Sequence, residues 1–294
     1  MTYSTVAIIY NPNSTGPSKD MAKEFAKNLR ARLPKQKIEL IATKHAGHAE
    51  ELAYSIAKKS KNPLVISSSG DGGYNELING AMKAQHDGYT ITTSLLPAGN
   101  ANDHFRNLNT DDLVDLVARD KTRKIDLLKL KSTAEGKPIE RYAHSYIGIG
   151  LTPKVGKELN KSELNLFTEV WLVTRALLTV RPVRLKLGNK VRRYESVIFS
   201  NVDQMSKYMK ISQPSKVNDG TFEVTIFRRS QKLKLILLLL KASVIGVKEN
   251  TSTSKYSLET VGKTLIQADG EIVTVDGGVK VEVTAEKRIL RCII

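Results

Sequence analysis

Short apolar runs alternate with amphipathic segments along the first hundred residues. Val6-Ala7-Ile8-Ile9-Tyr10 is a continuous apolar run typical of a buried strand, and turn residues follow it at 11–16. The segment 21–33 then places apolar side chains at helical spacing. The same order recurs, with strands predicted at 38–41, 64–67 and 90–96 and helices at 50–57 and 75–84. This repetition predicts an α/β domain in which helices cover both faces of a parallel sheet.

The pattern changes after about residue 126. Short β-branched segments separated by turns follow, at 141–149, 183–187, 196–200, 221–227, 264–268, 271–275 and 279–283. Two helices are predicted among them, at 164–178 and 232–244. The second half therefore reads as an antiparallel, β-rich domain. We predict domains at 1–126 and 127–284, and the tail 285–294 is a candidate for packing back onto the first.

Charge is concentrated in the second half. The formal net charge is +16, of which residues 1–126 carry +3 and residues 127–294 carry +13. Such a basic surface attracts nucleic acid, acidic membranes or phosphorylated ligands. A group of basic side chains follows two predicted strands and forms either a solvated face or a contact for acidic lipid head groups: Arg181, Arg184, Lys186, Lys190, Arg192 and Arg193.

Two features bear on the cellular location. The longest apolar block, 235–240, is far shorter than the roughly 20 residues of a membrane-spanning helix. The single cysteine, Cys292, excludes an internal disulfide and fits a reducing compartment. We expect a cytoplasmic protein that associates peripherally with membranes.

Three loops follow predicted strands of the first domain, at 11–16, 70–73 and 97–103. Ligands of parallel α/β sheets gather at the carboxyl ends of the strands, and a glycine loop leading into a helix presents backbone N–H groups suited to phosphate. Asp71 would repel phosphate unless it holds a cation, accepts a hydroxyl proton or fixes the loop by hydrogen bonds. Taken alone, Gly70-Asp71-Gly72 could equally be a simple turn.

A series of short motifs, in order along the chain, match one known pattern. They are Asn11-Pro12-Asn13-Ser14; Thr43 followed by His48-Ala49-Glu50-Glu51-Leu52-Ala53; Gly70-Asp71-Gly72-Gly73-Tyr74-Asn75-Glu76 with Asn79-Gly80; Pro97-Ala98-Gly99-Asn100-Ala101-Asn102-Asp103-His104-Phe105; Ile125-Asp126-Leu127; Asn218-Asp219-Gly220-Thr221-Phe222-Glu223-Val224; and Ala268-Asp269-Gly270-Glu271. Together they resemble the catalytic domain of diacylglycerol and sphingosine kinases, most closely the bacterial branch.

The resemblance implies a nucleotide domain of the NAD-kinase and phosphofructokinase type joined to a β-rich lipid-substrate domain. The implied reaction transfers the γ-phosphate of ATP, with Mg²⁺, to the hydroxyl of diacylglycerol or a related lipid alcohol. The implied partners are that lipid and an anionic membrane surface; a homodimer is left open and nucleic acid is not expected.

The resemblance also assigns roles to particular residues. The implied ATP-binding residues are Asn11, Pro12, Asn13, Ser14, Thr15, Thr43, Gly70, Asp71, Gly72, Gly73, Tyr74, Asn75, Glu76 and Asn100. Asp71, Asp103 and Asp126 would form an acidic network, and Glu271 or Asp269 would be the general base, with Asp71 also counted as catalytic. Asp219 with the carbonyls of Lys216 and Thr221 matches a structural Mg²⁺ loop.

Two positions depart from the family pattern. Gly73 and Asn100 stand where the family has threonines expected near the nucleotide, so two hydroxyls are lost. A catalytically weakened lipid- or nucleotide-binding homologue is therefore one alternative. A kinase of a soluble polyol or nucleotide on the same fold is another. Asp219 could also be an ordinary turn residue, and the five histidines are expected to be surface or packing residues.

Overall fold

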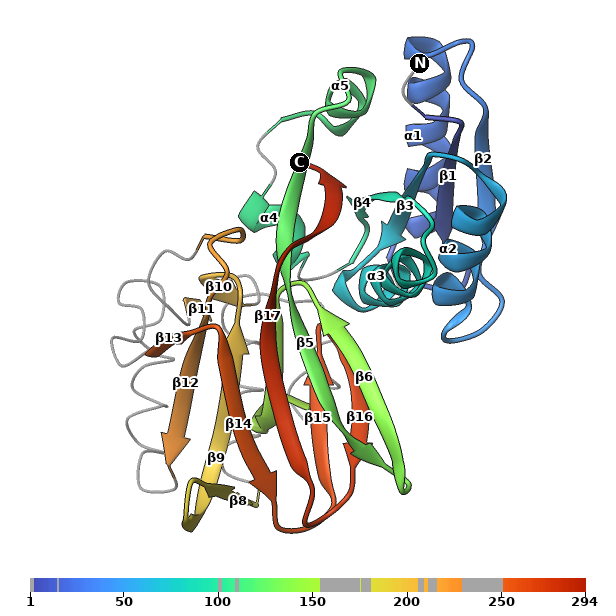
Figure 1. Ribbon diagram of the computed structural model, residues 1–294. Helices are drawn as coiled ribbons and strands as arrows, with labels where there is room; N and C mark the ends of the chain where they lie inside the picture. Colours follow the sequence, from blue (N-terminus) through green and yellow to red (C-terminus); the bar gives the residue numbers. More distant parts are fainter. Residues whose placement is uncertain are drawn as a thin grey trace. The chain divides into compact units, whose positions relative to one another are not determined.

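The computed structural model describes residues 3–14, 16–99, 102–108, 111–153, 175, 181–205, 209–210, 216–228 and 251–294. Its chain forms two compact units: unit 1 contains Met1–Ile125 and Arg288–Ile294, and unit 2 contains Asp126–Lys287 (Figure 1). Thr15, Asn100, the predicted helix 232–244 and all of the predicted helix 164–178 except Arg175 lie outside the described residues.

Unit 1 is built on a parallel sheet. Its elements are β1 (Thr5–Tyr10), α1 (Ser18–Arg32), β2 (Ile38–Ala42), α2 (His48–Lys59), β3 (Pro63–Ser69), α3 (Asp71–His86), β4 (Thr92–Pro97), α4 (Asp103–Leu108) and α5 (Leu113–Ala118). The strands lie in the order β2-β1-β3-β4, all parallel, and the end of β17 (Lys280–Ile293) adds a parallel strand beside β4, with Cys292 opposite Thr93.

Helices cover both faces of this sheet, as continuous apolar strands require. On one face Val6, Ile8 and Ile66 pack against α1 and α5. Side chains alternate between faces along a strand, so Ala7 and Ile9 point to the opposite face, where α2 and α3 lie side by side (Figure 1). Their close approach depends on a glycine.

That glycine is Gly80, in the second half of the Asn79-Gly80 motif. A Cβ placed on Gly80 would lie 2.2 Å from the carbonyl oxygen of Glu50 in α2. Asn79 donates its amide N–H to the carbonyl oxygen of Asn75, one turn earlier. The motif therefore sets the packing of α3 on α2.

Unit 2 is an antiparallel sheet. Its strands are β5 (Thr122–Ala134), β6 (Lys137–Ala143), β7 (Tyr146–Gly150), β8 (Val183–Leu187), β9 (Lys190–Ser200), β12 (Phe222–Arg228), β13 (Thr251–Thr253), β14 (Lys255–Thr260), β15 (Thr264–Ala268), β16 (Glu271–Val275) and β17, with a separate pair β10 (Gln204–Met205) and β11 (Met209–Lys210). The main order is β16-β15-β7-β9-β8-β14-β17; β12 and β13 extend it from β9, and β5 and β6 from β17.

The core of unit 2 lies on one face of this sheet, where alternate residues of β7, β9, β12, β15 and β17 converge. Phe199 and Phe222 are its largest fully buried members and contact each other edge to face, with ring centroids 5.9 Å apart. Strand β5 begins in unit 1 and continues into unit 2, and β17 runs the other way.

The predicted fold class is confirmed, but two local predictions are wrong and three elements were missed. The predicted strand 141–149 is two strands, β6 and β7, separated at His144 and Ser145. The predicted loop 70–73 is shorter, because helix α3 already begins at Asp71. Helices α4 and α5 and the long strand β5 were not predicted from the apolar pattern.

Candidate active site

Three loops of unit 1 touch through their glycines. A Cβ on Gly16 would lie 2.4 Å from the carbonyl oxygen of Ala98, and one on Gly99 would lie 2.3 Å from the Cα of Gly70. The Ala98 N–H donates to the carbonyl oxygen of Ser69 at 2.9 Å. The loops after β1, β3 and β4 are therefore in backbone contact, which no residue with a side chain would allow.

Helix α3 begins directly in the middle of this loop cluster. Gly70 is its N-cap and has extended backbone geometry, while Asp71, Gly72 and Gly73 form its first turn. The first N–H groups of a helix have no acceptor within the helix, and the helix dipole is positive there. These residues fit a polyphosphate, because the side-chain-free glycines leave the backbone N–H groups accessible to it.

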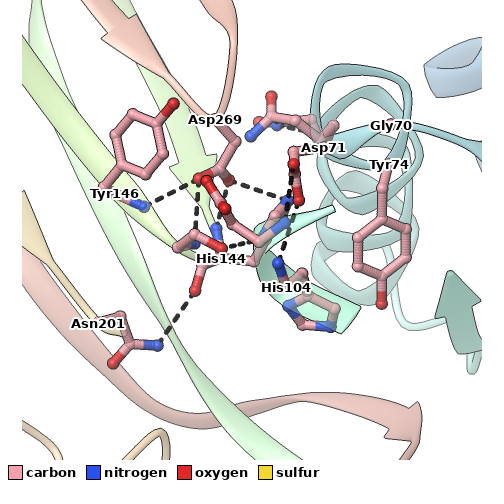
Figure 2. Close-up of polar contacts among 12 residues, drawn as sticks. Gly70, Asp71, Tyr74, His104, His144, Tyr146, Asn201 and Asp269 are labelled. Atoms are coloured by element: carbon pink, nitrogen blue, oxygen red, sulfur yellow. Dashed lines mark hydrogen bonds and ion pairs between the residues drawn. The ribbon is translucent and has the colours of Figure 1, made fainter. Parts of the chain in front are cut away.

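The Asp71 carboxylate holds the start of α4. One of its oxygens accepts the N–H of Asp103 at 3.0 Å and the other accepts the N–H of His104 at 3.1 Å (Figure 2). Of the three roles that the sequence leaves open for Asp71, these contacts match the last, in which its hydrogen bonds fix a loop. Asp103 is itself buried and accepts a 2.7 Å ion-paired hydrogen bond from Arg106.

The ring of His104 then packs on helix α3. It lies 4.8 Å, centroid to centroid, from the ring of Tyr74. The Tyr74 hydroxyl shares a 3.0 Å hydrogen bond with that of Thr93, and burial raises the pKa of Tyr74 well above its usual value. Tyr74, predicted to bind the nucleotide, is fully buried and packs against His104 at the start of α4.

The loop after β1 is held by its own polar side chains. The carboxamide oxygen of Asn11 accepts the N–H of Asn13 at 2.9 Å, and the Ser14 hydroxyl donates to the carbonyl oxygen of Gly16 at 2.8 Å. Pro12 is exposed between them. The side chains of this loop shape its backbone and bring it to Ala98.

Two further predicted residues act on the loop after β2. The Thr43 N–H donates to the carbonyl oxygen of Tyr10 at 2.9 Å. Glu76 accepts the N–H of Gly47 at 2.8 Å and that of Ala49 at 3.2 Å, at the start of α2. Asn75 is buried. Of the predicted ATP-binding residues that the structure describes, all lie in or next to these loops.

A second set of polar residues lies in unit 2 around Asp269. Asp269 and Gly270 form the two-residue hairpin between β15 and β16, with φ angles of 47° and 102°. Both values are positive, as a type I′ turn requires, and Asp-Gly is a favoured sequence for it. Glu271 is the first residue of β16 and is exposed.

The Asp269 side chain is fully buried and accepts three backbone hydrogen bonds. Its donors are the N–H groups of His144 at 2.6 Å, Ser145 at 3.0 Å and Tyr146 at 2.9 Å (Figure 2). These bonds take the N–H groups of residues 144–146 out of the strand ladder. They are the physical reason why the predicted strand 141–149 is broken.

His144 and Ser145 complete this cluster and were not predicted as site residues. The His144 Nε2 lies 3.3 Å from an Asp269 oxygen, and its Nδ1 shares a 2.7 Å hydrogen bond with the Ser145 hydroxyl. Asn201 donates its amide N–H to the carbonyl oxygen of His144 at 3.3 Å. The one signal for them in the sequence is that His144 and Ser145 are two adjacent polar residues within the predicted strand 141–149.

Asp126 is bonded to the turn that contains Asp219, in another part of unit 2. Asp126 is fully buried, accepts the N–H of Gly220 at 2.6 Å and donates its own N–H to the carbonyl oxygen of Val217 at 2.7 Å. Asp219 and Lys216 are exposed, and Asp219 accepts both the N–H and the hydroxyl of Thr221 at 3.0 and 2.9 Å. Asp126 thus holds the turn that carries Asp219.

A family model for the diacylglycerol kinase catalytic domain matches residues 5–130, which include the glycine loops and Asp71. This matched stretch is what the chain shares in sequence with the diacylglycerol kinase catalytic domain. A diacylglycerol kinase of Staphylococcus haemolyticus is 26% identical over 249 residues, covering 80% of this chain and 71% of the relative. One of Bacillus subtilis is 24% identical over 284 residues, covering 90% and 88%.

Solved structures resemble the chain along its whole length. A crystal structure of a diacylglycerol kinase from Bacillus anthracis has a TM-score of 0.72 at 18% identity, covering 100% of this chain and 97% of that chain. Yeast NADH kinase in complex with NADH has a TM-score of 0.55 at 11% identity, covering 99% and 83%. The chain therefore shares its fold with both of these proteins. None of the helices in the described ranges combines the length and apolar character of a membrane span.

Proposed function

We propose that the chain is a lipid kinase that transfers the γ-phosphate of ATP to the hydroxyl of diacylglycerol or a related lipid alcohol. The observation that carries the proposal is the glycine loop cluster at the start of α3, which lies within a matched diacylglycerol kinase catalytic domain. Phosphoryl transfer requires backbone N–H groups and a divalent cation to hold phosphate charge. Unit 1 would bind and orient the nucleotide through the N–H groups of Gly72 and Gly73.

Asp71 has a positioning role in this proposal. Its two hydrogen bonds to the start of α4 hold the loop after β4 against the loop after β3. Mg²⁺ would neutralise phosphate charge during transfer. The predicted second site for Mg²⁺ would use Asp219 with the carbonyls of Lys216 and Thr221.

Glu271 is our candidate for the general base, which takes the proton from the acceptor hydroxyl. Asp269 is less suited to that role, because both of its oxygens already accept backbone hydrogen bonds in a fully buried position. Asp269 would instead fix the hairpin that presents Glu271, which is the next residue but one and is exposed.

The test is a transfer assay with purified protein, radiolabelled ATP and Mg²⁺. Vesicles containing diacylglycerol, ceramide or monoacylglycerol are compared with soluble polyols and nucleosides. We expect one lipid to be labelled and Glu271→Gln to abolish labelling. Glu259→Gln, at a half-buried glutamate paired with Lys186, should retain it. Labelling of a soluble alcohol would favour the polyol or nucleoside kinase, and ATP binding without transfer to any acceptor would favour the weakened homologue.

We also propose that unit 2 docks on anionic membranes. It contains the basic side chains Arg184, Lys190, Arg192 and Arg193, which are all exposed, and each such charge near an anionic surface contributes about 1 kcal/mol. Sedimentation with phosphatidylserine vesicles should exceed that with phosphatidylcholine vesicles and should fall as salt rises. Equal binding to both would contradict the proposal.

A further inference from the structure

Gly73 is the position at which this chain departs most clearly from the family pattern, and its surroundings account for the departure. It is in the first turn of α3, where glycine is about 1 kcal/mol less favourable than alanine. A Cβ on Gly73 would lie 2.7 Å from the Cβ and 2.8 Å from the Oγ of Ser69. The space for a side chain at residue 73 is therefore already filled by Ser69.

Ser69 is the last residue of β3 and lies one residue before the N-cap of α3. Its hydroxyl shares a 2.7 Å hydrogen bond with the hydroxyl of Ser67 and donates a 3.0 Å bond to the carbonyl oxygen of Gly70. Ser67 is buried, whereas Ser69 is only half-buried. The buried Ser67 thus fixes the position of the Ser69 hydroxyl, which is itself partly accessible.

The Ser69 proton can change its acceptor without leaving Gly70 unsatisfied. The carbonyl oxygen of Gly70 also accepts the N–H of Tyr74 at 3.1 Å, which is the first bond of the helix. If the Ser69 hydroxyl turned toward an anion, Gly70 would keep this bond and Ser67 could donate to the Ser69 oxygen. A hydroxyl beside a helix N-terminus then adds a donor to the N–H groups of the first turn.

We infer that Ser69 supplies to the nucleotide phosphates the hydroxyl that residue 73 lacks, and that Ser67 positions it. The inference rests on the proposed use of ATP. It makes residues 69 and 73 a coupled pair, because only one of them can carry a side chain in this space. A hydroxyl at residue 69 or at residue 73 would donate to the same phosphate, and side chains at both positions would clash.

The experiment is a double-mutant cycle between residues 69 and 73, with two measurements on each variant and no lipid present. Equilibrium binding of a fluorescent ATP analogue measures the hydroxyl contact, and thermal melting measures the steric pairing. We expect Ser69→Ala to bind the analogue about tenfold more weakly, as for loss of one hydrogen bond to a charged group. Ser67→Ala should weaken it by a smaller factor, and Ser60→Ala, a serine after α2, should bind as the unmodified chain does.

The second half of the cycle moves the hydroxyl. Gly73→Thr alone should lower the melting temperature, because its Cβ meets Ser69. Combining Gly73→Thr with Ser69→Gly should restore both the melting temperature and the affinity to within about threefold. A double variant no better than Gly73→Thr alone, or a Ser69→Ala variant with unchanged affinity, would overturn the inference.

These outcomes separate the inference from the proposed kinase activity. The protein could bind nucleotide with an affinity that falls on Ser69→Ala and yet phosphorylate no alcohol. That result would contradict the kinase proposal and support the inference. Phosphorylation of lipid by a protein whose nucleotide affinity is unchanged by Ser69→Ala would support the kinase proposal and contradict the inference. A chain that binds no nucleotide would contradict both.

Discussion

Replacing Asp269 by asparagine tests whether this residue holds the hairpin or takes part in the chemistry. Asparagine has nearly the same shape, but its side chain has one acceptor oxygen and one NH₂ donor. In the structure both Asp269 oxygens face N–H groups: one faces His144, and the other faces Ser145 and Tyr146. In either orientation the NH₂ group of the amide therefore points at a backbone N–H donor.

The expected loss follows from those bonds. The best amide orientation keeps the two bonds from Ser145 and Tyr146 and loses the 2.6 Å bond from His144, leaving a buried N–H without an acceptor. An unsatisfied buried donor costs about 1–3 kcal/mol, and loss of the carboxylate charge weakens the remaining bonds. We expect the free energy of unfolding to fall by about 2–4 kcal/mol. With a urea dependence of about 2 kcal/mol per molar, the midpoint would move down by about 1–2 M.

Urea unfolding followed by circular dichroism measures this loss, with two variants for comparison. Asp276→Asn is the matched control, because Asp276 also accepts two backbone N–H bonds, from Glu135 and Gly136, but at an exposed turn. Its loss should stay below about 1 kcal/mol. Glu271→Gln should retain full stability and lose phosphoryl transfer. An Asp269→Asn variant as stable as the unmodified chain would refute the positioning role, and a fully active Glu271→Gln would refute its assignment as base.

Three other predictions concern packing and titration. Gly99→Ala should destabilise by about 2–4 kcal/mol in thermal melts, because its Cβ would lie 2.3 Å from Gly70, whereas Gly262→Ala, with open space around it, should change stability by less than about 0.5 kcal/mol. Burial raises the pKa of Cys292 to about 12, so a thiol reagent at pH 8 should label the native chain roughly a thousandfold more slowly than the unfolded chain; rapid native labelling would contradict the buried position. Hydrogen bonds from two lysines lower the pKa of Glu282 from 4.5 to about 2, so its stabilising contribution is present above pH 4.5 and is lost as the pH falls toward 2. Glu282→Gln should therefore show a smaller loss of urea midpoint over that interval, and an unchanged pH profile would count against the ion pairs.

The parallel sheet of unit 1 could be predicted because its physical cause is local. The runs at Val6 and Leu64 are apolar at every position, as strands covered on both faces must be, and glycine or proline follows each of them. The short helices α4 and α5 could not be predicted in this way. Each has six residues, too few for an amphipathic period to be visible, and α4 is held by Asp71 from the first turn of α3.

The candidate site was predictable as a set of loops and not as a set of contacts. The Asp-Gly pair at residues 269–270 indicates a hairpin, but the full burial of Asp269 depends on a strand break more than a hundred residues earlier. In the same way, the sequence marks Gly73 as a departure from the family and says nothing of Ser69, whose side chain fills the space beside it. The burial of a side chain and its contacts with distant segments depend on the tertiary structure. They cannot be predicted from the spacing of motifs along one sequence.

The placement of Arg288–Ile294 in unit 1 has a consequence for the order in which the chain folds during its synthesis. Strand β4 obtains its outer neighbour only from β17, where Cys292 lies beside Thr93. A ribosome delivers that segment after the whole of unit 2, so until then the nascent sheet has an exposed apolar edge. Unit 2 is continuous in sequence and can close first. A segment made after unit 2 then completes the domain that was begun before it.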